Sequence, residues 1–168
     1  MRALFTTLLV LTISTLHVMG QDPQAHVDNG QQLIQNGKYE EALEQFNMAI
    51  ILDPASQTAF IQRAFTYSVL KDYESAISDY SHVLQLNPAL ISAYLSRGSA
   101  YNKLERFEEA LQDFNKVIEL DPNNSEAYNN RGWSKKGMGD KDGACADWKT
   151  SKKMGNQEAK IILKNNQC

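Results

Sequence analysis

The residues best suited to specific polar chemistry in this chain are arginines and aspartates that recur at a fixed interval. The recurring residues are Arg63, Arg97 and Arg131, and Asp79, Asp113 and Asp147. The interval is 34 residues, the length of a repeat in this chain. In the first repeat the two equivalent positions hold Asn29 and Gln45 instead of Arg and Asp. Pairing within one repeat leaves no charge alone, whereas pairing between successive repeats would set Arg63 against Gln45 and strand Asp147. We therefore expect three structural ion pairs within repeats, which mainly set register.

Catalytic signatures are missing from the sequence. It contains no Gly-x-Ser-x-Gly, no His-Glu-x-x-His and no glycine-rich phosphate loop. After the N-terminal segment only His26 and His82 remain, in different repeats, so a metal site built from histidines and a cysteine is not expected. The sequence therefore predicts no enzyme activity, no cofactor and no metal.

The elements that position these residues follow from a 34-residue repeat. Pro54, Pro88 and Pro122 each follow an Asp or Asn. Equivalent positions in successive repeats form columns, and three further columns hold small or aromatic residues. They are Ala42, Ala76, Ala110 and Ala144; Phe46, Tyr80, Phe114 and Trp148; and Gly30, Ala64, Gly98 and Gly132. In each repeat an apolar pattern at helical spacing breaks at a short polar turn, resumes, and stops at the proline. This pattern predicts four helix pairs.

The third copy resembles the tetratricopeptide repeat family. The residues that fall on its motif are Tyr94, Gly98, Tyr101, Ala110, Phe114 and Pro122, while Arg97 replaces the usual leucine. The resemblance implies an all-α, right-handed superhelix of antiparallel helix pairs, with a concave groove lined by the first helix of each pair. We expect a single domain over residues 21–168. Its repeats are expected at residues 23–56, 57–90, 91–124 and 125–156.

The last repeat needs a cap, because a helix pair cannot bury its apolar face alone. Residues 157–168 have an amphipathic pattern and are the expected capping helix. In this family the column of Cys145 faces the next helix, which here is the cap ending at Cys168. The resemblance thus implies a disulfide between Cys145 and Cys168; the alternative is one buried and one frayed thiol. The C-terminal stretch also looks like that of exported bacterial repeat proteins, especially from Bacteroidetes.

The N-terminus has the pattern of a signal peptide. Arg2 precedes an apolar stretch from Ala3 to Met19, and Val18 and Gly20 are the small residues of a cleavage site. We expect removal of residues 1–20. An uncleaved anchor and an ordinary core helix are the alternatives, but the stretch is short for a bilayer. The prediction is an exported protein, periplasmic or secreted, without a membrane span after cleavage.

The charge of the chain argues against nucleic acid as a partner. The sequence carries 17 Lys and Arg against 20 Asp and Glu, a formal net charge of −3. Phosphate binding needs a concentrated basic face. The one basic cluster, in the last repeat, is interrupted by Asp140, Asp142 and Asp147, which is typical of a solvated face.

The first helices should line a groove without a charged clamp. Chaperone adaptors of this family hold a peptide carboxylate with Lys or Arg and Asn at fixed groove positions, and here no Lys or Arg occupies those positions. The groove residues that we expect are Val27, Gln31, Ile61, Gln62, Phe65, Leu95, Ser99, Asn129, Asn130 and Trp133. Such a surface favours an extended or helical peptide with apolar anchors. Alternatively, some of these side chains contact only neighbours across the repeat interface.

The sequence thus predicts a noncatalytic, monomeric module that binds a protein or peptide in its concave groove. The alternative is a structural subunit whose repeats stack end to end, so that it self-assembles or organises a complex. An enzyme is the remote alternative.

Overall fold

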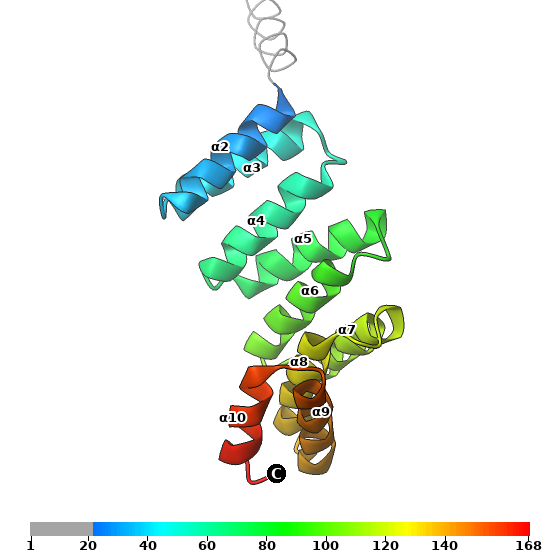
Figure 1. Cartoon of the computed structure of the whole chain (residues 1–168). Helices are drawn as coiled ribbons and strands as arrows, with labels where there is room; N and C mark the ends of the chain where they lie inside the picture. Colours follow the sequence, from blue (N-terminus) through cyan, green and yellow to red (C-terminus); the bar gives the residue numbers. More distant parts are fainter. Residues whose placement is uncertain (1–21) are drawn as a thin grey trace, which may run out of the picture. The chain divides into compact units, whose positions relative to one another are not determined.

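The computed structural model describes residues 22–168, so the predicted signal peptide lies outside the described residues. The described residues fall into two compact units, a first unit that ends at Thr66 and a second unit, Tyr67–Cys168. All regular structure in residues 22–168 is helical (Figure 1). The helices are α2 (Pro23–Gln35), α3 (Tyr39–Leu52), α4 (Gln57–Val69), α5 (Tyr73–Leu86), α6 (Ile91–Lys103), α7 (Phe107–Leu120), α8 (Ser125–Gly137), α9 (Lys141–Lys153) and α10 (Gln157–Asn165). No described helix is long and apolar enough to cross a membrane.

The residue before each repeat proline ends a second helix. Asp53 follows α3 with an extended backbone, and its Oδ1 accepts a hydrogen bond from the amide of Ala55 over 3.0 Å. Equivalent turns follow α5 at Asn87 and α7 at Asp121. Asp and Asn favour such turns because their side chains bond to the backbone two residues on. The acid or amide before each proline is therefore explained by local turn chemistry.

In the second unit, small residues let paired helices approach closely. A Cβ added at Gly98 on α6 would lie 2.9 Å from Cε1 of Phe114 on α7. A Cβ at Gly132 on α8 would likewise overlap the indole of Trp148 on α9. Phe114 and Trp148 are buried, so each aromatic ring fills the space that the facing glycine leaves open.

The first unit repeats this contact between α2 and α3. The ring of Phe46, which is fully buried, lies where a side chain at Gly30 would be. Val27, Ala49 and Ala59 form a small core, against which Ile50 packs. The helices α2, α3 and α4 thus each contribute one residue to that core.

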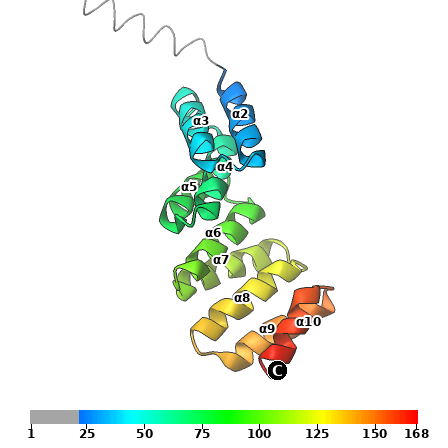
Figure 2. The same ribbon diagram turned by 90° about the vertical axis from the view of Figure 1, so that its left-hand side faces the viewer.

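The C-terminal helix α10 packs beside α9, as both views show (Figures 1 and 2). It begins at Asn156, whose Oδ1 accepts hydrogen bonds from the amides of Glu158 and Ala159. Capping of this kind satisfies amides that have no partner within the helix. Ala159 is the buried residue of α10, and the helix covers the end of the last helix pair.

Candidate functional site

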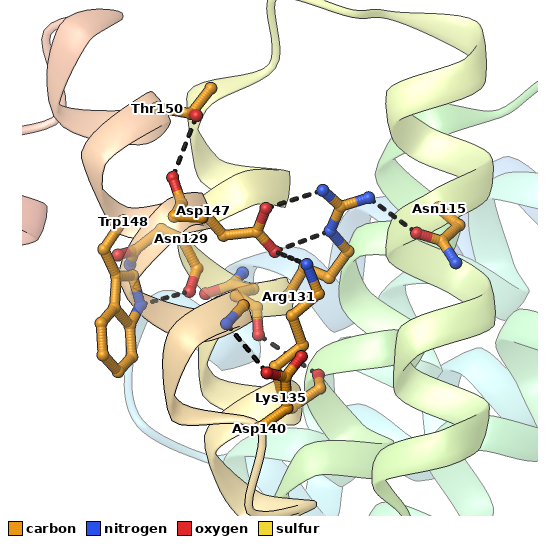
Figure 3. Close-up of polar contacts among 12 residues, drawn as sticks. Asn115, Asn129, Arg131, Lys135, Asp140, Asp147, Trp148 and Thr150 are labelled. Carbon is orange, nitrogen blue, oxygen red and sulfur yellow. Dashed lines mark hydrogen bonds and ion pairs between the residues drawn. The ribbon is translucent and has the colours of Figure 1, made fainter.

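The arginine and aspartate columns come together in the second unit. Arg97 on α6 donates to Asp113 on α7 from Nε over 2.9 Å and from Nη2 over 2.7 Å. Arg131 on α8 makes the same two-pronged contact with Asp147 on α9, over 2.8 and 2.7 Å (Figure 3). Both arginines therefore contact the aspartate of their own helix pair.

The remaining guanidinium nitrogen of each arginine reaches the preceding helix pair. Nη1 of Arg131 donates to Oδ1 of Asn115 over 2.8 Å, and Nη1 of Arg97 donates to Oγ of Ser81 over 3.0 Å. In the first unit, Nη1 of Arg63 on α4 donates to Asn47 on α3 over 2.6 Å. Sequence reasoning missed this column of acceptors. Its signal was the recurrence of Asn, Ser and Asn at the 34-residue spacing.

The ion pairs are largely desolvated. Hydrogen bonding to Asp113 raises the pKa of Arg97, and hydrogen bonding to Asp147 raises the pKa of Arg131. Burial raises the pKa of the Asp113 carboxyl, and Arg97 opposes that effect. Desolvation thus offsets part of the attraction within each pair.

Asp147 also binds a second cation. Nζ of Lys135 lies 2.9 Å from its Oδ2, so one buried carboxylate is shared by Lys135 and Arg131 (Figure 3). The first repeat replaces this chemistry with neutral groups, since the Asn29 amide lies 3.5 Å from Oε1 of Gln45. Asp79 is buried in the second unit, and its pairing with Arg63 stays a prediction.

The two cysteines lie at disulfide distance, with their Cα atoms 5.5 Å apart. Cys145 is on α9 and Cys168 lies just beyond α10. Within residues 22–168 no group of three or more His, Cys, Asp or Glu side chains is arranged to hold a metal ion.

A cavity of about 550 Å³ opens between first helices of the second unit and the C-terminal helix. We call it the C-terminal cavity. Its lining residues come from α6, α7, α8 and α10: Ser99, Asn102, Lys103, Phe107, Asn129, Asn130, Trp133, Lys136, Gly137 and Glu158. Four of the predicted groove residues, Ser99, Asn129, Asn130 and Trp133, are therefore brought together. Phe107, Lys136 and Glu158 were not predicted.

Trp133 is the main apolar surface of this cavity. Its side chain is 39% exposed, and its ring meets the buried Trp148 edge to face, with centroids 5.2 Å apart. Nζ of Lys136 lies 4.9 Å from the Trp133 ring, a cation–π geometry. Contacts on two sides hold the indole in place while the rest of its surface faces solvent, which suits an anchor for a partner.

Asn129 gives the cavity a polar group without a partner. Its side chain is 4% exposed, and its Oδ1 has no hydrogen-bond partner among the described residues. Its backbone carbonyl accepts from Nε1 of Trp148 over 3.1 Å. An unsatisfied buried acceptor is costly, and this oxygen is shielded from solvent as well as unpaired.

The neighbouring Asn102 has a different role. Its Nδ2 donates to the carbonyl of Asn130 over 3.2 Å, and its Oδ1 accepts from Oγ of Ser134 over 2.8 Å. Both ends of this amide are engaged, and they tie α6 to α8. Asn102 therefore shapes the cavity rather than offering it a vacant polar group.

The other predicted groove residues have different surroundings. Val27 is 1% exposed and packs in the core of the first unit, so the prediction that it faces a groove is corrected. It packs there with Ala49 of α3 and Ala59 of α4. In the same unit Gln31, Ile61 and Gln62 are half-buried and Phe65 is 46% exposed. Leu95 is half-buried on α6 and is not a lining residue of the C-terminal cavity.

Paired helices, the recurring small and aromatic contacts and the absence of strands from residues 22–168 define an all-α repeat protein. Residues 58–90, 91–124 and 114–146 each match the tetratricopeptide repeat. The chain belongs to the tetratricopeptide repeat family, which confirms the predicted fold class of a helical solenoid.

Solved structures of this fold are similar to most of the chain. The first TPR of Spaghetti (RPAP3), bound to the HSP90 peptide SRMEEVD, is 32% identical; the match covers 70% of this chain and 93% of that one, with a TM-score of 0.66. A crystal structure of MamA is 22% identical over 83% of this chain and 76% of that one, with a TM-score of 0.75. MamA from Desulfovibrio magneticus RS-1 is 20% identical over 82% and 77%, with a TM-score of 0.77.

No curated protein sequence matches the chain. Tetratricopeptide repeat proteins are generally noncatalytic, and the fold and its structural neighbours support a protein-interaction module.

Proposed function

We propose that the protein is a noncatalytic interaction module that binds a peptide segment of a partner in the C-terminal cavity. The observation that carries this proposal is the exposed, positioned indole of Trp133 in a cavity that is also lined by amide and hydroxyl side chains. Trp133 supplies apolar contact area, and Asn130 and Ser99 supply polar groups beside it.

A peptide fits these groups better than a small metabolite. The lining combines the aromatic side chains of Phe107 and Trp133 with the amides and hydroxyl of Asn129, Asn130 and Ser99. Extended peptides present apolar side chains together with backbone amides. The structural neighbour bound to an HSP90 peptide supports this choice of ligand class.

The proposed location is the periplasm or the extracellular space. The Arg2-led apolar segment supports export. The cysteine pair at disulfide distance supports it further, because structural disulfides persist in oxidising compartments.

The binding proposal is tested with peptides selected from a displayed library on the oxidised full-length protein. Isothermal titration should show that Trp133→Ala weakens the selected peptide by at least about tenfold, as expected for a buried aromatic anchor. Met138→Ala is the matched control, because Met138 is 44% exposed on the same segment but does not line the cavity. Equal affinities of the two variants would contradict the proposal.

The predicted monomeric state has its own test. Sedimentation of the mature protein should give a monomer at micromolar concentration. Concentration-dependent assembly that Trp133→Ala leaves intact would favour the structural alternative, in which repeats stack end to end.

A further inference from the structure

We propose that the disulfide between Cys145 and Cys168 is a redox latch for the C-terminal cavity. In the oxidised protein the bond holds α10 against α9, where it forms one wall of the cavity. Reduction by a dithiol releases α10, and the cavity loses that wall. The inference rests on the proposed function, since it concerns the regulation of the same site.

The helix α10 is short and only partly buried. It has nine residues; Ala159 is buried, Ile162 and Leu163 are half-buried, and Ile161 is 63% exposed. Isolated helices shorter than about 12 residues are marginal in water, so α10 depends on its attachments. The disulfide fixes the far end of the helix, because Cys168 follows it and Cys145 lies on α9.

Release of α10 would act directly on the residues of the cavity. Glu158, in the first turn of α10, lines the cavity. Near the other end, Oδ1 of Asn166 accepts a hydrogen bond from Nζ of Lys136 over 2.6 Å. The same ammonium lies over the Trp133 ring. One helix thus supplies a wall and holds the lysine beside the proposed anchor.

The surroundings of the disulfide suit exchange with a thiol. A second cavity of about 200 Å³ lies beside it, lined by Lys136, Lys141, Ala144, Cys145, Trp148 and Asn166. Cys145 and Cys168 are only half-buried, so an attacking thiolate can reach them. Lys136 and Lys141 line the same cavity as Cys145, and nearby cations make a cysteine a better leaving group by lowering the pKa of its thiol.

The exchange needs a dithiol as its reductant. A thiolate of the dithiol attacks Sγ of Cys168, the bond between the two cysteine sulfurs breaks, and Cys145 leaves as a thiolate that takes up a proton. The second thiol of the reductant loses its proton, and the resulting thiolate attacks the reductant's first sulfur, which is bonded to Cys168 in the mixed disulfide. Cys168 is expelled as a thiolate and is protonated. The protein disulfide gains two electrons and two protons, and the dithiol is oxidised to a disulfide.

Hydrogen–deuterium exchange on the full chain, before and after dithiothreitol, tests the latch without any ligand. Amides of α10 should exchange at least about tenfold faster after reduction, while those of α8 and α9 stay within about threefold, because only a local opening is proposed. Acrylamide should quench tryptophan fluorescence more strongly in the reduced form. Trp133 lines the C-terminal cavity and Trp148 lines the cavity beside the disulfide, so release of α10 increases the access of the quencher to both indoles.

Variants separate the latch from an effect of the reductant. Cys168→Ser without dithiothreitol should exchange like the reduced wild type. Asn165→Ser, an exposed change beside the same helix end that keeps both cysteines, should exchange like the oxidised wild type. Unchanged α10 exchange on reduction overturns the proposal, and so does equal acceleration across α8, α9 and α10.

The regulatory consequence is measured with the selected peptide. Its affinity should fall at least about tenfold on reduction, because the bound peptide loses the α10 wall. If α10 is released but the affinity is unchanged, the cavity is not regulated and the proposal is overturned. If no peptide binds either form while α10 is released on reduction, the proposed binding function fails and the conformational response remains.

Discussion

Arg131 holds Asp147 through two parallel hydrogen bonds, 2.8 Å from Nε and 2.7 Å from Nη2, and its third nitrogen reaches Asn115 on the preceding helix pair. One guanidinium thus joins two helices of one repeat and connects them to the preceding repeat. Arg is suited to this position because its planar fork matches a carboxylate and leaves a donor to spare. Lysine could not make the same set of contacts.

Pairing within a repeat predicts a specific energetic coupling. A double-mutant cycle on Arg97 and Asp113 should give a coupling of about 1 to 3 kcal/mol in urea unfolding, because the two side chains share two hydrogen bonds. A cycle on Asp79 and Arg97 is the control and should give much less. Equal or reversed couplings would show that the main pairing runs between repeats.

The acceptor column predicts a smaller effect at Asn115. Asn115→Ala should lower the free energy of unfolding by about 1 kcal/mol, since Arg131 loses one hydrogen-bond acceptor. Gln112→Ala, an exposed change on the same helix, should leave the unfolding midpoint nearly unchanged. A similar loss in both variants would mean that the bond to Asn115 contributes nothing specific.

The disulfide should stabilise the C-terminal part of the chain. It links residues 23 positions apart, and a loop of this size corresponds to about 3 kcal/mol on the chain-entropy model. We expect Cys168→Ser to lower the denaturation midpoint under nonreducing conditions and to abolish the effect of dithiothreitol on that midpoint. Two thiols titrating in the denatured, nonreduced protein from its native host would refute the bond.

Export predicts a processed N-terminus. Mass spectrometry of the protein from its native host should show a chain that begins at Gln21, after cleavage beyond Gly20. Recovery of soluble protein with an intact Met1 from the cytoplasm would contradict export. It would also weaken the case for an oxidised cysteine pair, because cytosolic thiols are kept reduced.

The sequence alone was enough to predict the helix pairs and the fold class. Proline acts on its own turn, and Asp53 bonds to an amide two residues away, so these signals are local and read directly from the chain. The contact of Gly98 with Phe114 repeats at a constant spacing, and periodicity turns a tertiary contact into a sequence pattern. The N-terminal prediction stays open, since residues 1–20 lie outside the described part.

Only the tertiary structure decided which side chains share the C-terminal cavity. Phe107, Lys136 and Glu158 belong to three different helices and follow no common column, so no spacing in the sequence could bring them together. Val27 packs with Ala59 of a later helix, which its own groove position did not reveal. Local and periodic interactions depend on the spacing of residues along the chain, so the sequence predicts them. A cavity depends on how helices that are distant in the chain pack together, so only the tertiary structure defines its lining.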